Sequence, residues 1–368
     1  MRKLYIVSTS DEPNNVILGH ASFARQAGWI PVFVFPFREG CAKFEEFYKD
    51  QEIVRLNFVF SARGGFAYVW SLVLLNLYTT WKFLFRPSAA NFLAVDLTGV
   101  LACAFLKLRG ARIHALVNDN FSARYAVSKK VYKILRYFEA TSLRFFCSSS
   151  IFPDKSRYIL LGSPSLDNLS FVPNILTDQY APRYVGNASD KLSVMLCGWL
   201  VASRGIELLP QLLEKTDDQV EFLLVGSGDD DAIAKLQRHP RVKYVGHVSR
   251  EENLDFMKSV DINVAFYNPT ILINRHALPQ KIYDSLMIGC PLFINSEVQM
   301  STELLQHSAC ITAGYFDVDA IVEKLNALSK NKLSLRTMSE SVLRYSAQAA
   351  NFQQAQAAGV HVYTNMAR

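Results

Sequence analysis

The chain has 368 residues, which is long for a single hydrophobic core, so two domains are expected. Half of the residues are apolar and 20% are charged, a balance that excludes a largely disordered chain. The net charge of +6 is unevenly spread: residues 1–170 carry 21 Lys/Arg against 12 Asp/Glu, and the remainder carries 18 against 21. A basic N-terminal half could face nucleic acid or an anionic membrane, and the lack of a nucleic-acid motif favours the membrane.

The cysteines and the N-terminus both indicate a cytoplasmic protein. The six cysteines are scattered without a Cys-x-x-Cys pair, which argues against a zinc site and favours reduced thiols. Met1-Arg-Lys leads directly into a short strand-like segment and not into the apolar region of a secretory signal.

The first half of the chain alternates segments typical of strands and of helices. A helix is predicted at 16–27, and strands are predicted at 4–9, 31–35, 53–60, 92–97, 112–117 and 144–147. Strands that alternate with helical segments are typical of a parallel sheet with crossover helices. An α/β domain is therefore expected over residues 1–172.

The same rhythm restarts after Val172-Pro-Asn174. Strands are predicted at 193–197, 221–225, 242–245, 262–266 and 292–295, with helices at 206–215, 230–237, 253–259 and from 281, and then helices to the C-terminus. A second α/β domain is expected over 173–345, and a C-terminal helix at 346–368 is expected to pack back toward the N-terminal domain. Open parallel sheets bind ligands at the carboxyl ends of their strands, so a cleft between the two halves is the expected site.

Two segments of the first half bear on a membrane. Residues 64–81 carry no charge, and they are interpreted as a core crossover helix, as a helix whose Trp/Tyr-rich end touches a bilayer, or as a membrane span. A span is disfavoured because it would interrupt the sheet. A predicted helix further on carries Lys129, Lys130, Lys133 and Arg136 beside an apolar side. This helix could present a solvated face or dock on lipid, and the clustering of one charge sign favours docking.

Residues 278–295 combine a cation and a carboxylate with the start of a helix. Lys281 and Asp284 stand three residues apart in an apolar helix that Gly289 ends, so their side chains point the same way. The N–H groups and the positive dipole end at a helix N-terminus favour a phosphate there. A cation for phosphate beside a carboxylate for ribose hydroxyls is what a nucleotide-diphosphate site needs.

Further segments of the second half carry a family resemblance. In chain order they are Val172-Pro-Asn174, Cys197-Gly-Trp-Leu-Val-Ala-Ser-Arg-Gly-Ile206, Phe222-Leu-Leu-Val-Gly-Ser-Gly228, Val242-Lys-Tyr-Val-Gly-His-Val248 and Asp261-Ile-Asn-Val-Ala265. Together with 278–295 they resemble the donor domain of GT-B glycosyltransferases, particularly family 4 and its bacterial polysaccharide relatives. The resemblance covers roughly residues 172–300, and the N-terminal half resembles these enzymes only in architecture. It implies two Rossmann-like domains whose parallel sheets face a central cleft.

The resemblance assigns a nucleotide-sugar donor to a defined set of residues. Arg204 stands at the family's loop lysine and would bind the diphosphate with Lys281, since a guanidinium suits phosphate oxygens. Asp284 stands at the acidic position that hydrogen-bonds the ribose hydroxyls, and the turn at 246–248 would contact the base. The donor-binding residues implied in this way are Gly198, Arg204, Gly246, His247, Val248, His276, Lys281 and Asp284.

The sequence departs from the family pattern at three positions, of which only His276 belongs to the implied donor-binding set. Ile175 replaces the glycine that follows Pro-Asn in the family. Trp199 replaces a frequent arginine; it could stack on the donor, but a core tryptophan is favoured. His276 stands eight residues before Asp284, where the family has a glutamate that contacts the donor sugar. His276 could contact a sugar hydroxyl or be exposed without a role, so the sugar and the stereochemical course stay open.

Two carboxylates end predicted strands of the first half and are the candidate catalytic residues. Asp96 follows the residues Phe92-Leu-Ala-Val95, and Asp119 lies between Asn118 and Asn120, whose amides suit hydroxyl recognition. An inverting enzyme needs a carboxylate as general base on the acceptor, whereas in a retaining enzyme these residues would orient the acceptor. Each could also be an ordinary turn aspartate.

No metal ion or cofactor is expected, because Asp229-Asp-Asp231 is typical of a helix cap and the nucleotide-sugar is a substrate. The expected function is transfer of a sugar, from a UDP-sugar rather than a GDP-sugar, to a lipid-linked glycan. The expected place is the cytoplasmic face of a bacterial inner membrane, in lipopolysaccharide, O-antigen or capsule assembly, with the anionic membrane surface as a partner and no nucleic acid. A sugar-nucleotide epimerase or hydrolase and a catalytically silent scaffold protein are the alternatives.

Overall fold

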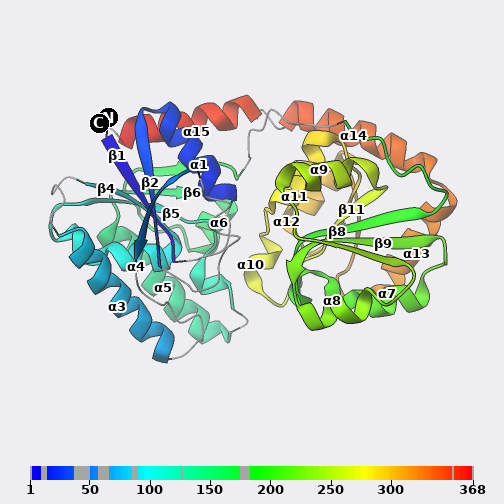
Figure 1. Ribbon diagram of the computed structural model, residues 1–368, viewed down its shortest axis with the longest axis horizontal. Coiled ribbons are helices and arrows are strands. Elements are labelled where there is room, and N and C mark those ends of the chain that lie inside the picture. Colours follow the sequence, from blue (N-terminus) through cyan, green and yellow to red (C-terminus); the bar gives the residue numbers. More distant parts are fainter. Residues whose placement is uncertain are drawn as a thin grey trace. The chain divides into compact units, whose positions relative to one another are not determined.

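The computed structural model describes residues 2–9, 15–36, 50–56, 66–84, 90–125, 127–174, 183–349 and 352–366. The chain divides into two compact units, Met1–Leu176 with Phe352–Arg368, and Thr177–Asn351 (Figure 1). Each unit has one sheet, and every strand pair in both sheets is parallel. The predicted α/β class with two parallel sheets is confirmed.

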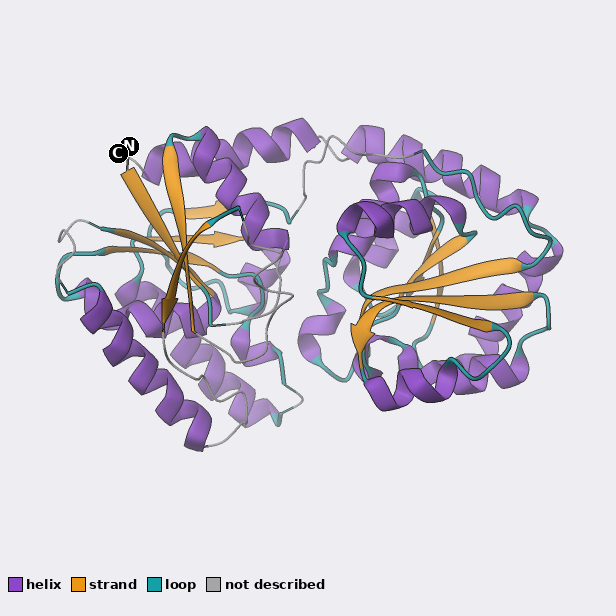
Figure 2. Ribbon diagram, in the orientation of Figure 1, coloured by secondary structure: helices purple, strands orange, loops and turns teal. Residues whose placement is uncertain are grey.

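The first unit is built on a seven-stranded sheet in the order β3-β2-β1-β4-β5-β6-β7. Its strands are β1 (Arg2–Val7), β2 (Trp29–Pro36), β3 (Glu52–Leu56), β4 (Asn91–Val95), β5 (Arg112–Leu116), β6 (Ser149–Phe152) and β7 (Leu169–Phe171). Its helices are α1 (Asn15–Gln26), α3 (Phe66–Lys82), α4 (Asp96–Lys107), η1 (Phe121–Ala123), α5 (Lys129–Phe146), α6 (Lys155–Leu160) and α15 (Phe352–Met366). Figure 2 shows helices on both faces of this sheet.

Alternation of side chains along β1 explains why both faces are covered. Leu4 and Ile6 enter one core with α1 and α15, whereas Tyr5 and Val7 enter the other with α3, α4 and α5. Successive side chains of a strand point to opposite faces, so a strand with no polar face needs cover on both sides. The four consecutive buried residues of β1 therefore require a three-layer arrangement.

The C-terminal helix α15 completes one face of the first unit. Tyr363 is fully buried; its carbonyl accepts a hydrogen bond from Trp29 Nε1 at 2.9 Å, and its hydroxyl lies 2.9 Å from His20 Nδ1 on α1. Burial lowers the pKa of His20 to about 3, so its imidazole is neutral at neutral pH. This helix, far away in sequence, is thus part of the core of the N-terminal unit.

The second unit is built on a six-stranded sheet in the order β10-β9-β8-β11-β12-β13. Its strands are β8 (Leu192–Leu200), β9 (Val220–Gly228), β10 (Val242–Gly246), β11 (Ile262–Ala265), β12 (Leu292–Asn295) and β13 (Cys310–Ala313). Its helices are η2 (Ala202–Arg204), η3 (Ile206–Leu208), α7 (Leu209–Lys215), α8 (Asp230–Leu236), α9 (Arg250–Ser259), α10 (Leu272–Arg275), α11 (Gln280–Ile288), α12 (Gln299–Gln306), α13 (Val318–Lys330) and α14 (Leu333–Ala349).

Some predicted boundaries are corrected by the structure. The strand predicted at 144–147 is wrong: α5 extends to Phe146, and the next strand begins at Ser149. The apolar run at the end of α5 resembles a short strand, but Leu143 faces the core while Arg144 and Phe145 are exposed, as a helix requires. Strands β7 and β13 were not predicted, and residues 57–60 of the strand predicted at 53–60 lie outside the described residues.

Helix α3 corresponds to most of the uncharged segment at 64–81, whose first two residues are not among those described. Leu75 and Thr79 are buried, and Asn76 Nδ2 donates to the Leu101 carbonyl of α4. In the part of the chain that the structure describes, no helix is both long and apolar enough to cross a membrane. The five described cysteines are buried free thiols.

Candidate functional site

Two cations of the predicted donor site meet at one aromatic ring. Tyr267, which follows β11, is 2% exposed. The Arg204 guanidinium carbon lies 4.3 Å from the centre of its ring, and Lys281 Nζ lies 5.9 Å from the same point. A cation over an aromatic face is attracted by the ring quadrupole. Arg204 and Lys281, 77 positions apart in sequence, are therefore both held at the Tyr267 ring.

The backbone around these cations is shaped by glycines. Gly205 has φ +93° and follows Arg204, so the chain turns sharply from η2 into η3. Gly198 has φ +94°, and the nearest group to a Cβ at that position would be Lys281 Cε at 3.9 Å. The end of β8 thus runs beside the Lys281 side chain, which is near the N-terminus of α11.

Asp284 is buried inside the unit and ion-paired. Its Oδ1 accepts hydrogen bonds from Arg250 Nη2 at 2.8 Å and from Gln280 Nε2 at 2.9 Å. Arg250 is the first residue of α9 and is separated from the turn at 246–248 only by the N-cap Ser249. A buried carboxylate is stable only when paired, and here the pair ties the first turns of α11 to the turn after β10. Arg250 was not among the residues predicted for the site.

The turn after β10 has the shape expected for close approach of a ligand. Gly246 has φ +92° and no atom within 4 Å of a Cβ built there. His247 is exposed, while Val248 packs partly on the core formed by Met195, Cys197 and their neighbours. The turn is therefore fixed by Val248 and open at Gly246 and His247.

Trp199 and His276 are the two positions of this unit where the sequence departs from the family pattern. The expectation of a core tryptophan is wrong: Trp199 is 57% exposed, because it pairs with Ser227 beyond the core, at the carboxyl end of β8. His276 caps the short helix α10, and its Nδ1 lies 2.9 Å from Gln299 Oε1. All the predicted donor residues lie at or just beyond the carboxyl ends of strands of this sheet, or on α10 and α11.

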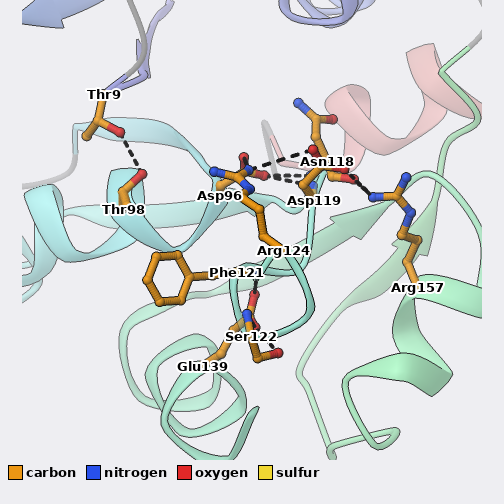
Figure 3. Close-up of polar contacts among 10 residues, drawn as sticks. All are labelled: Thr9, Asp96, Thr98, Asn118, Asp119, Phe121, Ser122, Arg124, Glu139 and Arg157. Carbon is orange, nitrogen blue, oxygen red and sulfur yellow. Dashed lines mark hydrogen bonds and ion pairs between the residues drawn. The ribbon is translucent and has the colours of Figure 1, made fainter. Parts of the chain in front are cut away.

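In the first unit, the two candidate carboxylates lie next to each other (Figure 3). Asp96 is the first residue of α4 and has φ +55°, a left-handed conformation that aspartate tolerates better than most residues. Its Oδ1 accepts from the backbone N–H groups of Asn118 at 2.8 Å and Asp119 at 3.1 Å, and its Oδ2 accepts from Arg124 Nη2 at 3.0 Å. Burial raises the pKa of Asp96, against the effect of Arg124.

Asp119 is the more accessible carboxylate. Its side chain is 43% exposed, against 18% for Asp96. Its Oδ1 accepts from Arg157 Nη1 at 2.5 Å, and its Oδ2 lies 3.7 Å from Arg124 Nη2. Although burial alone would lower the pKa of Arg124, the two aspartates raise it, so this guanidinium stays charged. Neither arginine was singled out as part of a site from the sequence, although Arg124 follows Asp119 by only five positions.

The amides beside Asp119 have unused hydrogen-bonding capacity. The side-chain oxygen and nitrogen of both Asn118 and Asn120 are buried without a hydrogen-bond partner. Buried polar groups are normally paired with protein or with ordered water. The turn at 118–124 is therefore polar, with two carboxylates, two guanidiniums and two amides gathered at the carboxyl end of β5.

These observations define a class: a two-unit α/β protein with a cationic site at the strand ends of one unit and a carboxylate–guanidinium cluster at those of the other. Residues 194–331 match the family "Glycosyl transferases group 1". No curated protein has a sequence that matches the chain. The resemblance seen in the sequence is thus confirmed for the second unit.

Solved structures are similar over the whole chain. HepE from Anabaena, in complex with UDP and glucose, has a TM-score of 0.69 and 13% identity over 100% of this chain and 98% of its own. Sucrose-phosphate synthase from Thermosynechococcus elongatus has a TM-score of 0.74 and 12% identity, over 100% and 99%. WaaG, a glycosyltransferase involved in lipopolysaccharide biosynthesis, has a TM-score of 0.66 and 9% identity, over 98% and 99%. The chain has the GT-B fold, and residues 194–331 of its second unit are similar to the group 1 glycosyltransferases.

Proposed function

We propose that the chain transfers a sugar from a nucleotide-sugar to a glycan acceptor, with a UDP-sugar as the donor. The observation that carries the proposal is the meeting of Arg204 and Lys281 over Tyr267, at the strand ends of the unit with the family match. Two cations held together suit the two phosphates of a donor. UDP is favoured over GDP because the similar HepE was solved with UDP.

In the proposed reaction, the second unit stabilises the leaving diphosphate. As the glycosidic bond breaks, negative charge grows on the phosphate oxygen that departs. Arg204, Lys281 and the N-terminus of α11 would bind that charge, a preorganised electrostatic role that often dominates catalysis. We propose that these groups serve in place of a metal ion. Asp284 would hold the ribose, and the turn at Gly246 and His247 would border the base.

The acceptor hydroxyl is assigned to the cluster around Asp119. Asp119 is the exposed member, and the orphaned amides of Asn118 and Asn120 could bond sugar hydroxyls after a small movement. Both Asp119 oxygens already face guanidiniums, so orientation of the acceptor suits this carboxylate better than proton abstraction. Asp96 would act through the backbone of the turn, as a positioning residue.

The acceptor is proposed to be lipid-linked, because the first unit carries an apolar and basic face. The apolar side chains of α3 that are exposed fall on one helical stripe, namely Trp70, Val73, Leu74, Leu77 and Trp81. Helix α5 exposes Ile134, Tyr137, Phe138 and Phe145, together with Lys129, Lys130 and Lys133. Exposed apolar side chains that gather on the outer face of a helix mark an interaction site, and the lysines select an anionic lipid surface.

This surface implies peripheral binding at the cytoplasmic face of a bacterial inner membrane, in cell-surface polysaccharide, lipopolysaccharide or O-antigen assembly. The similarity to WaaG agrees with that setting. Wild-type protein should co-sediment with phosphatidylglycerol vesicles at low salt. Replacing Lys129, Lys130 and Lys133 with glutamine should weaken binding by about 1 kcal/mol per lysine. Equal binding to pure phosphatidylcholine vesicles would contradict an electrostatic docking surface.

The donor assignment is tested by calorimetry with UDP and GDP. UDP should bind more tightly than GDP, and a screen of UDP-sugars should identify a donor that the protein hydrolyses slowly without an acceptor. Absence of binding to either nucleotide would refute the transferase site and leave a scaffold protein. Conversion of the donor sugar into its epimer would instead identify an epimerase.

A further inference from the structure

Glu139 is a fully buried carboxylate on α5, with an exposed fraction of 0%. Its Oε1 accepts a hydrogen bond from Phe121 N at 2.8 Å, and its Oε2 accepts from Ser122 N at 2.9 Å and from Ser122 Oγ at 2.7 Å (Figure 3). Burial raises the pKa of Glu139, and the hydrogen bonds from Ser122 and Phe121 oppose that rise. The three donors use both oxygens, so η1 is fastened to α5 at this point.

The same turn is fastened at its other end by Asp96. Asp96 accepts from the backbone of Asn118 and Asp119 and pairs with Arg124, which follows η1. Residues 118–124 are therefore held between two carboxylates, one at the start of α4 and one in the middle of α5. Asp119, the proposed acceptor contact, lies inside this segment.

Helix α5 also carries part of the lipid-docking face. Phe138, the residue before Glu139, is 48% exposed, and Ile134 and Tyr137 lie on the same outer side. Consecutive residues of a helix point about 100° apart, so one stretch of α5 can face lipid with Phe138 and hold the turn with Glu139. The docking face and the hydrogen bonds to the acceptor turn are thus on the same stretch of one helix.

We propose that Glu139 couples docking of α5 on an anionic bilayer to the stability of the turn at 118–124. The inference rests on the proposed function, since an ordered turn matters only if Asp119 meets an acceptor. When the turn opens, its hydrogen bonds to Glu139 break and α5 is loosened. A lipid surface that binds native α5 more tightly than loosened α5 therefore also disfavours opening of the turn. The turn at 118–124 would then be most ordered when the enzyme is bound at the membrane surface, where lipid-linked acceptors are found.

Amide hydrogen exchange of the full chain tests the coupling. Phosphatidylglycerol vesicles should slow the exchange of the Phe121 and Ser122 amides in the wild type by at least about threefold, and pure phosphatidylcholine vesicles should not. In Glu139→Gln this slowing should disappear, because the amide has one acceptor oxygen and turns an N–H₂ group toward the donors of the turn. Donor binding, which involves the other unit, should be unchanged.

Two further variants control the result. Asp167→Asn removes an exposed carboxylate from the same unit and should behave like the wild type. Ser122→Ala removes one of the three bonds to Glu139 and should reduce the vesicle effect, which keeps the test available if Glu139→Gln does not fold. Equal slowing in Glu139→Gln and the wild type would overturn the coupling, as would no slowing in the wild type. If the proposed function itself is wrong, the wild-type protein should show no UDP binding in calorimetry, which is a separate result.

Discussion

Replacing Lys281 with alanine should lower kcat/KM for the sugar donor by at least about 100-fold, roughly 3 kcal/mol of transition-state stabilisation. Lys281 is one of two cations over Tyr267, and its ammonium would face the departing diphosphate. Arg204→Ala should have an effect of similar size. The double variant should lose more than the sum of the two single losses, because in each single variant the remaining cation can still move toward the phosphates.

Matched variants show whether the effect belongs to the site. Lys235→Ala removes an exposed lysine from α8 of the same unit and should leave kcat/KM unchanged. Arg204→Lys keeps the charge but loses the planar guanidinium, so it should recover part of the activity only. Steady-state kinetics and calorimetry with UDP measure both effects. Unchanged UDP affinity and turnover in Lys281→Ala would refute the assignment of the diphosphate to this pair.

Gly226→Ala should destabilise the second unit by at least about 3 kcal/mol, the largest stability effect expected for a single added methyl group. Strands β8 and β9 approach so closely that a Cβ at Gly226 would lie 1.9 Å from the Gly198 carbonyl oxygen, and φ is +135° there. The strain has no flexible side chain to absorb it, so the strand ends must separate. The displacement would reach Gly198 and, beside it, Lys281.

Gly246→Ala provides the control, since it has a positive φ but free space. The cost there should be about 1 kcal/mol, from the left-handed backbone alone. Chemical denaturation followed by far-UV circular dichroism compares the two variants. Similar losses of stability in both would show that backbone conformation, and not the close approach of β8 and β9, requires glycine at 226.

The sequence was most informative where a local pattern has one structural solution. Gly289, expected to end a helix, is the left-handed C-cap of α11 with φ +83°. The run Leu-Phe-Ile-Asn after Pro291 is strand β12, as predicted. These features depend on neighbours in sequence, and hydrophobic periodicity with glycine positions is enough to find them.

Local sequence patterns led to wrong predictions where contacts with residues distant in sequence determine the structure. The end of α5 was expected to be a strand, since Leu143, Phe145 and Phe146 are apolar and only packing shows which of them are buried. Trp199 was expected in the core, because tryptophan is usually buried, and the length of β8 past the sheet core exposes it.

The amino-acid sequence by itself determined the α/β class, the family resemblance of the second half and the identity of the cationic residues Arg204 and Lys281. Only the tertiary structure decided that these cations share the ring of Tyr267, that Asp284 is paired with Arg250, and that Asp119 lies between Arg124 and Arg157. The physical reason is that backbone preferences act over a few residues, whereas ion pairs and ring contacts form between side chains that the fold brings together. The residue types of such a site can be recognised in the sequence, but the geometry among them exists only once the chain is folded.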